Sequence, residues 1–301
     1  MKNEKSVLEI VLGELADVLA HPSDEFPTVR CISKPRLVSL LGRVVKKLGL
    51  AIPSSLSAIQ IVQLLLRSRV VTSVPLDSVA PGVPIDRFLA IGLGVDASML
   101  NPLELLQAHR PDGVVCYFSA LMVHQLVTQP TTHHHIAEFR KPSPSASRSK
   151  PELRTTRNPP PMGSPDFSYR GLGYYRTKRD PRYLAAFQRF DLNEESWFRA
   201  TTLEQTLVDA VHRPMSCGGP PVVFEAWENG AELLKIDRLI ALLKKIDDDN
   251  LSRRVGFMME LYGLQFDGVD SARRPNAGAA VPLLVGIPYT KLDNRWNLLV
   301  P

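Results

Sequence analysis

The chain has 301 residues, of which 44% are hydrophobic and 22% are charged. This length favours two or three domains of about 100 to 150 residues, and the composition excludes a wholly disordered chain, a collagen and a coiled coil. No apolar run approaches the roughly 18 residues that a membrane span requires, and the N-terminus lacks a secretory signal. Three widely spaced cysteines, Cys31, Cys116 and Cys217, predict neither a disulfide framework nor a metal site. We therefore expect a cytoplasmic protein that does not contact a membrane.

The charge of the chain is arranged in blocks, which the net charge of +5 conceals. Residues 26–76 contain eight Lys or Arg and no Asp or Glu, whereas residues 191–250 contain twelve acidic and six basic residues. Residues 140–189 form a second basic block of twelve Lys or Arg against three acidic residues. Such a distribution predicts a polyanion-binding surface on one part of the molecule and not on another.

The N-terminal region predicts three helices in succession. Apolar residues follow a 3.6-residue period in the first 20 residues, in a second segment from Lys34 to Gly49, and in a third that begins after Pro53 and continues through Leu66. Ser33 and the serines after Pro53 are suitable N-caps, and Pro35 fits the first turn of the second helix.

Two strands are predicted directly after these helices. The β-branched run Val70–Val74 and the segment Arg87–Ile91 are joined by a connection that contains Pro75 and Pro84. Three helices followed by a two-stranded ribbon is the order of a winged helix-turn-helix, in which the third helix enters the DNA major groove and the ribbon contacts the backbone. We therefore predict a winged-helix domain over residues 1–98.

The polar and basic residues of the second and third predicted helices are the candidate DNA contacts. Lysines and arginines would contact phosphates, and the glutamines could read adenine. The candidates are Arg36, Arg43, Lys46, Lys47, Ser57, Gln60, Gln63, Arg67 and Arg69. The alternatives are a small helical core whose basic residues are incidental, or a winged helix that binds protein.

A larger mixed α+β domain is predicted over residues 99–301. Residues 141–166 are rich in proline, serine and basic residues, which predicts a flexible loop. Strands are expected at residues 131–138, 172–177, 183–192 and 197–201, and helices at 102–107, 118–126, 203–211, 222–228, 236–246 and 251–262. The fold class is therefore α+β, with an N-terminal winged helix and a larger domain that ends in a helical subdomain.

Three segments of this larger domain resemble one protein family. They are Tyr117–Leu126 (YFSALMVHQL), Thr201–Gly219 (TTLEQTLVDAVHRPMSCGG) and Ser252–Leu261 (SRRVGFMMEL). Together they are similar to the AbiEi-type antitoxins and transcriptional regulators of abortive-infection, or type IV, toxin–antitoxin modules. Gln125 stands where that family usually has glycine. Together with the last six residues, the resemblance covers most of residues 54–301, with 141–166 as an insertion.

The resemblance implies a sequence-specific repressor of its own promoter, where the winged helix would bind inverted repeats as a pair of protomers. It also implies that the C-terminal region counteracts a toxin with a nucleotidyltransferase fold. No catalytic residue and no cofactor are implied, so we expect a protein that is not an enzyme.

Other candidate chemistries find less support in the sequence. His133, His134 and His135 lie in a predicted strand, so only the first and third share a face, and we expect a structural role instead of a metal site. The acidic triplet Asp247–Asp249 is expected at a helix terminus. A metal-dependent nuclease would require a Glu-x-Lys or Asp-x-Lys motif, and neither occurs in the chain.

A second basic surface is possible within the second basic block. Tyrosine and arginine alternate from Tyr169 to Arg179, a composition that suits phosphate contacts and base stacking as well as a solvated hairpin. The candidates for this surface are Arg170, Tyr174, Arg176, Lys178 and Arg179.

Overall fold

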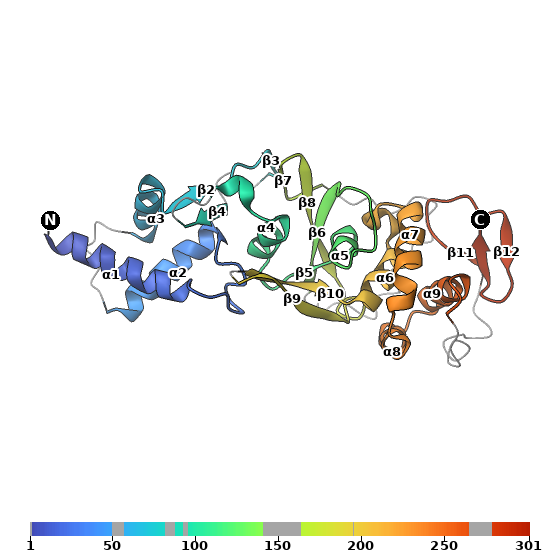
Figure 1. Ribbon diagram of the computed structural model, residues 1–301. Coiled ribbons are helices and arrows are strands. Elements are labelled where there is room, and N and C mark those ends of the chain that lie inside the picture. The colour runs from blue at the N-terminus through green and yellow to red at the C-terminus, as the bar shows by residue number, and fades with distance from the viewer. Residues whose placement is uncertain are drawn as a thin grey trace. The chain divides into compact units, whose positions relative to one another are not determined.

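The N-terminal helices of the protein pack with a three-stranded antiparallel sheet in the computed structural model (Figure 1). The structure describes residues 2–49, 57–81, 88–92, 96–140, 164–194, 196–264 and 279–301. The mixed α+β class is confirmed. The predicted loop at 141–166 lies almost entirely outside the described residues.

The chain folds into two compact units. The first comprises Met1–Gly113, Pro165–Tyr174 and Arg189–Arg199, and the second comprises Val114–Ser164, Tyr175–Gln188 and Ala200–Pro301. The first unit thus continues beyond residue 98 and includes a further helix.

The first unit begins with the predicted helices and strands. Its elements up to residue 113 are α1 (Lys2–Val18), β1 (Cys31–Ser33), α2 (Lys34–Lys47), α3 (Ala58–Arg67), β2 (Val71–Ser73), β3 (Ser78–Val79), β4 (Phe88–Ile91), the short helix η1 (Ala97–Met99) and α4 (Pro102–His109). The strand β1 was not predicted, because only three residues separate the polar turn from Lys34. It pairs with β4, and β4 pairs with β2, so the sheet order is β1-β4-β2.

The three N-terminal helices and this sheet enclose one apolar core. Leu37, Leu41, Val62 and Leu89 are fully buried in it, and Val11 of α1 packs against the same cluster. Burial of aliphatic side chains on α1, α2 and α3 fixes which face of each helix remains outside, and so decides where the polar residues of these helices lie.

A seven-stranded sheet follows, in the order β3-β7-β8-β6-β5-β10-β9. The new strands are β5 (Val114–Val115), β6 (His133–Phe139), β7 (Phe167–Tyr169), β8 (Leu172–Arg179), β9 (Phe187–Asn193) and β10 (Ser196–Thr201). Residues 183–186, predicted as the start of a strand, instead form a turn and loop before β9. The peptide groups of Ala185 and Ala186 bond to the Gln205 side chain there, which explains why strand pairing begins later.

The second unit contains the remaining helices and a small C-terminal sheet. Its other elements are α5 (Phe118–Val123), α6 (Leu203–His212), η2 (Pro214–Cys217), α7 (Pro220–Gly230), η3 (Ala231–Leu233), α8 (Ile236–Ile246), α9 (Asp249–Leu261), β11 (Val281–Pro282), β12 (Lys291–Asp293) and β13 (Leu298–Val300). The predicted helical region α6–α9 is confirmed. The chain does not end there, because β11, β13 and β12 form a further three-stranded sheet.

Candidate nucleic-acid interface

The predicted contact residues of α2 are presented by an amphipathic helix. Leu37, Leu40 and Leu41 are buried, and Lys46 and Lys47 are exposed in the last turn. Pro35 occupies the first turn, where the missing N–H costs no hydrogen bond. The helix ends at Lys47 with Leu48 as its C-cap, and Gly49 follows with a positive φ of 60°, which suits a residue without a side chain.

Two arginines of α2 contact the loop that precedes β1. The Arg36 guanidinium donates a 2.9 Å hydrogen bond to the carbonyl oxygen of Glu25, and the Arg43 guanidinium lies 2.5 Å from the Glu25 carboxylate. Both guanidinium groups also lie within 6 Å of the Phe26 ring centroid, at 5.7 and 5.9 Å. Partial burial lowers the pKa of Arg36, and Asp112 and Glu25 oppose that shift.

A second cation of α2 also forms an ion pair. The Lys47 ammonium forms an ion pair with Glu14 of α1. Residues 26–76 contain no Asp or Glu, yet the polyanion-binding surface expected from them is not free of carboxylates. Carboxylates from residues before the basic block approach Arg43 and Lys47, because α1 and the following loop pack beside α2.

The outer face of α3 carries the predicted glutamines. Gln60, Gln63 and Arg67 are exposed, whereas Ile61, Val62 and Leu65 are buried in the core. This arrangement follows from the helical period, because the three exposed residues recur at spacings of three and four. The three candidate contacts of α3 therefore lie on its exposed side.

Ser57 and Gln60 have a local role at the start of α3. The Gln60 side-chain oxygen accepts a 2.6 Å hydrogen bond from the Ser57 N–H, and the Ser57 hydroxyl accepts a 3.4 Å bond from the Gln60 N–H. This reciprocal pair is a capping box, which satisfies two backbone donors of the first turn. A bidentate contact from Gln60 to adenine would require this capping box to open.

Three predicted basic contacts form neither an ion pair nor a side-chain hydrogen bond within the described part of the chain. These residues, Lys46, Arg67 and Arg69, are exposed. An external anion can therefore bind these three cations without first breaking an ion pair within the described part of the protein.

Arg69 has an unusual backbone conformation. Its φ of 58° lies in the left-handed region, and the N–H groups of Arg69 and Val70 bond to the carbonyls of Leu66 and Leu65. This is the Schellman pattern, in which glycine normally occupies the left-handed position. At the end of α2 the corresponding residue is Gly49. Arginine at this position of α3 thus carries backbone strain.

The connection between β2 and β4 is anchored to a neighbouring strand. Its strand β3 pairs antiparallel with β7, with Ser78 opposite Ser168 and Val79 opposite Phe167. The Asp77 carboxylate also accepts a 2.7 Å hydrogen bond from the Gly171 N–H. These bonds anchor the described part of the connection within the first unit. Residues 82–87 lie outside the described part of the chain.

The predicted second basic surface is wrong for two of its five residues. The Tyr174 side chain is buried and stacks on Phe167, with ring centroids 4.5 Å apart. Arg179 is only 5% exposed. Arg176 lies 3.7 Å from Glu138, and Arg170 donates a 2.8 Å hydrogen bond to the Ser98 carbonyl, so both have protein partners. Lys178 is exposed.

Arg179 is the centre of a buried polar network in the second unit. Its guanidinium forms two hydrogen bonds with the Asp209 carboxylate, at 2.5 and 2.6 Å, and a third with the Tyr183 carbonyl. Gln205 donates a 2.8 Å bond to the same carboxylate. The Asp209 charge holds the pKa of Arg179 above its ordinary value despite burial. The alternation of basic and aromatic residues could not reveal this partner, which lies 30 positions away.

The histidine triplet is buried and has protein contacts. The rings of His133 and His135 lie 5.1 Å apart, which confirms that these two share a face of β6. The His133 ring nitrogens contact the Thr132 hydroxyl at 2.8 Å and the Ser216 carbonyl at 3.2 Å. Burial lowers the pKa of His134 to about 4 and that of His135 to about 3. Within the described residues, no cluster of His, Cys, Asp or Glu is arranged to hold a metal ion.

The acidic triplet lies at a helix junction, as predicted. α8 ends at Ile246, Asp247 has a φ of 50°, and Asp248 caps α9 by accepting a 3.1 Å hydrogen bond from the Leu251 N–H.

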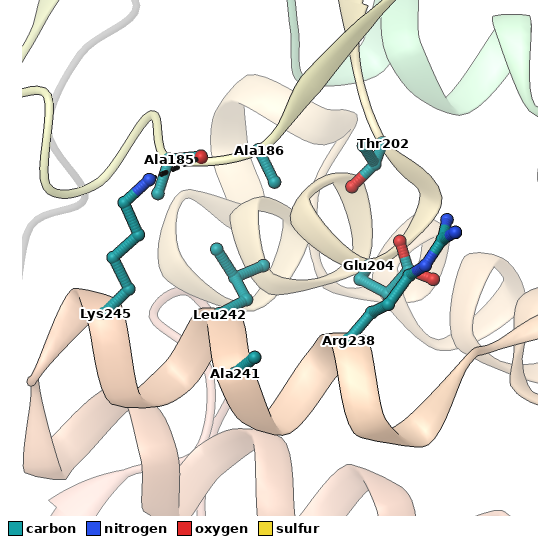
Figure 2. A pocket seen from close by; sticks show the side chains of 8 residues that line it. All are labelled: Ala185, Ala186, Thr202, Glu204, Arg238, Ala241, Leu242 and Lys245. Atoms are coloured by element: carbon teal, nitrogen blue, oxygen red, sulfur yellow. Dashed lines mark hydrogen bonds between the residues drawn. The ribbon is translucent and has the colours of Figure 1, made fainter.

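A shallow pocket of about 260 Å³ lies beside α8 in the second unit (Figure 2). Its floor is apolar, with Ala241 and Leu242 facing Ala185 and Ala186. Lys245 closes one end through a 3.0 Å hydrogen bond to the Ala185 carbonyl. The pocket holds no paired acid and base for catalysis, and we assign it no function.

Comparison with known proteins gives a distant structural likeness. No protein-family model matches the sequence, and no curated protein matches it. The crystal structure of the RV2827C protein from Mycobacterium tuberculosis is similar to this chain with 14% sequence identity and a TM-score of 0.48, covering 89% of this chain and 85% of that one. No described helix is long and apolar enough to span a membrane.

Proposed function

We propose that residues 1–98 form a winged helix-turn-helix domain that binds double-stranded DNA. The order of elements supports this proposal: α1, β1, α2, α3, β2, β3 and β4 follow each other, and β1, β4 and β2 form a sheet in the order β1-β4-β2. In a winged helix, α3 is the helix that enters the major groove, and β2 and β4 are the strands of the wing. The exposed polar face of α3 is consistent with that role.

The observation that carries the proposal is the exposed basic end of α3. Arg67 and Arg69 are exposed and form no ion pair among the described residues, and Gln63 lies on the same outer face as Arg67. Arginine contacts phosphate or guanine, and glutamine can bond to both the N6 and N7 positions of adenine. The face thus combines groups for backbone contact and for base recognition.

We further propose that the protein is the antitoxin of a toxin–antitoxin module and represses its own promoter. This part rests on the resemblance of three segments to AbiEi-type proteins. Two protomers would bind inverted repeats, and the second unit would counteract a nucleotidyltransferase-like toxin. Co-expression with the product of the neighbouring gene tests the antitoxin role, since the proposal expects this chain to restore growth that the neighbour alone arrests.

A competing function is protein binding by the same domain. The ion pairs of Arg43 and Lys47 favour it, because they reduce the charge available for phosphates. A gel-shift experiment with the gene's own upstream DNA and a shuffled DNA of equal length separates the two functions. The DNA-binding proposal expects a complex that prefers the upstream DNA and weakens with salt. Absence of a complex at low salt would favour the protein-binding function.

A further inference from the structure

Two aliphatic side chains lie on the outer face of α3. Ile59 is 54% exposed and Leu64 is 37% exposed, although the helix buries three other aliphatic residues in the core. Both belong to the described part of the first unit, and neither is a member of its buried apolar core. Their exposure leaves apolar surface in water, which is unfavourable by about 25 cal/mol per Å².

The two side chains flank the polar residues of that face. At 100° per residue, Ile59 and Leu64 define the two margins of an arc of about 140°. Gln63, Arg67 and Gln60 lie between them along this arc. The outer surface of α3 is therefore a polar strip with an aliphatic group at each side.

The capping box limits what the strip can recognise through hydrogen bonds. The Gln60 amide oxygen already accepts the Ser57 N–H, so Gln63 is the glutamine of this face whose amide has no such bond. A single amide between two aliphatic groups matches the major-groove edge of A·T pairs. Adenine presents N6 and N7 to a glutamine, and thymine presents its C5-methyl group to an apolar side chain.

The positive charge at the C-terminal end of α3 indicates which kind of ligand binds this face. Arg67 lies within the arc, Arg69 follows the helix, and residues 26–76 carry no acidic side chain. An acidic partner is required to complement these cations. Every DNA duplex has regularly spaced phosphates, and its major groove also presents thymine methyl groups. An acidic protein surface need not combine these two features.

We propose that α3 reads A·T base pairs, with Gln63 bonded to adenine and with Ile59 and Leu64 packed against thymine C5-methyl groups. This inference rests on the proposed DNA-binding function and adds the class of base pair that it recognises. It assigns Ile59 and Leu64 a role in specificity, although neither side chain can contact DNA by a hydrogen bond.

The test replaces thymine by uracil in the gene's own upstream DNA. Uracil keeps every hydrogen-bonding group of thymine and lacks only the methyl group. We expect the full-length protein to bind the uracil duplex about fourfold more weakly for one lost methyl contact and about 15-fold more weakly for two, since burial of one methyl group contributes roughly 0.8 kcal/mol. The variants Ile59→Ala and Leu64→Ala should each lose part of this difference, and the double variant should bind both duplexes equally.

The control variant Arg67→Ala should bind both duplexes more weakly and keep the full difference between them. Thermal unfolding of all variants checks that the fold is retained, which the exposure of Ile59 and Leu64 predicts. Equal affinity of the unchanged protein for both duplexes would overturn the inference and leave DNA binding intact. An undiminished difference in the Ile59→Ala, Leu64→Ala double variant would overturn it as well.

Two further results would go against the inference. If the unchanged protein bound neither duplex at low salt, the proposed function would fail together with the inference. If the double variant kept its DNA affinity but lost a complex with the neighbouring gene's product, the face would be a protein-docking surface.

Discussion

The Glu25 carboxylate lies 2.5 Å from the guanidinium of Arg43, which belongs to the helix that carries four of the nine predicted DNA contacts. Both side chains are about half exposed, so solvent screens the attraction and the pair contributes little to stability. Its main effect is on the electrostatic potential of the domain, because the negative charge of Glu25 offsets the positive charge of Arg43, which would otherwise attract a phosphate. Glu25 thus adjusts the affinity of the proposed interface.

Replacement of Glu25 by glutamine should strengthen DNA binding. The change Glu25→Gln frees Arg43 for a phosphate, and we expect roughly a twofold to fivefold gain in affinity and a salt slope steeper by about 0.9. Fluorescence anisotropy with labelled upstream DNA over a series of salt concentrations measures both quantities. Glu232→Gln, the same change at an exposed position of the second unit, serves as the matched control and should alter neither quantity. A weaker complex for Glu25→Gln would show that Glu25 positions Arg43 instead of masking it.

Glycine at position 69 should separate stability from DNA binding. Arg69 occupies the left-handed position of a Schellman motif, where a residue with a Cβ costs about 1 kcal/mol relative to glycine. Arg69→Gly should therefore raise the free energy of unfolding by up to about 1 kcal/mol and weaken DNA binding through the lost cation. Gln125→Gly is the control: Gln125 has a φ of 56° at the end of α5, in the same hydrogen-bond pattern. That variant should be stabilised without any change in DNA affinity, and a loss of stability in both variants would contradict the argument.

Gly256 should tolerate no larger side chain. A Cβ at this position would overlap the ring of Trp296, which is buried against α9. We expect Gly256→Ala to lower the free energy of unfolding by about 1–3 kcal/mol, measured by urea denaturation. Gly42→Ala in α2 is the matched control, because a Cβ there meets no atom within 4 Å, and this change should stabilise by about 0.5–1 kcal/mol. Equal effects of the two substitutions would refute the packing account.

The buried histidines of β6 should make the protein sensitive to acid. Burial lowers the pKa of His134 to about 4 and that of His135 to about 3, from an ordinary value of 6.5. Below pH 6.5 these histidines become protonated in the unfolded chain but stay neutral in the folded chain. The free energy of unfolding is therefore highest above pH 6.5 and falls as the pH decreases towards 4. At pH 5 each histidine should cost about 2 kcal/mol. Urea denaturation between pH 8 and pH 5 measures the loss, which should be smaller in His134→Gln, and a pH-independent stability would contradict the assignment.

The sequence predicted the elements better than it predicted their partners. The helical period of Leu37, Leu41 and Val62 correctly indicated the buried faces of α2 and α3, because burial follows directly from spacing. The strand β1 was missed, since three residues are too few to show an alternation. Its pairing with β4 depends on a contact between residues about 60 positions apart, and local patterns carry no information on such a contact.

The structure shows the exposure of the candidate residues and adds charged partners that local patterns could not indicate. Lys46, Gln63 and Arg67, which were named as candidate contacts from the sequence, are exposed in the structure. It could not indicate that Glu14 and Glu25 approach α2, because helix packing brings them there from outside the basic block. For the same reason Arg179 was assigned to a surface, although Asp209 holds it in the interior.

One motif acquires a physical explanation from the structure. Gly256 and Glu260 belong to the segment Ser252–Leu261 of α9, on which part of the proposed AbiEi-type resemblance rests. The Glu260 carboxylate accepts a 2.6 Å hydrogen bond from the Trp296 indole N–H, and Gly256 gives room to the same ring. The motif thus holds the C-terminal residues against α9.

The salt dependence of binding to the gene's own upstream DNA tests the central claim most directly. For the unchanged protein, the logarithm of the binding constant should fall with the logarithm of the salt concentration with a slope of about −3, if Lys46, Arg67 and Arg69 each contact one phosphate. Each single alanine variant at these positions should flatten the slope by about 0.9. A slope that stays the same in the triple alanine variant would contradict the proposed interface.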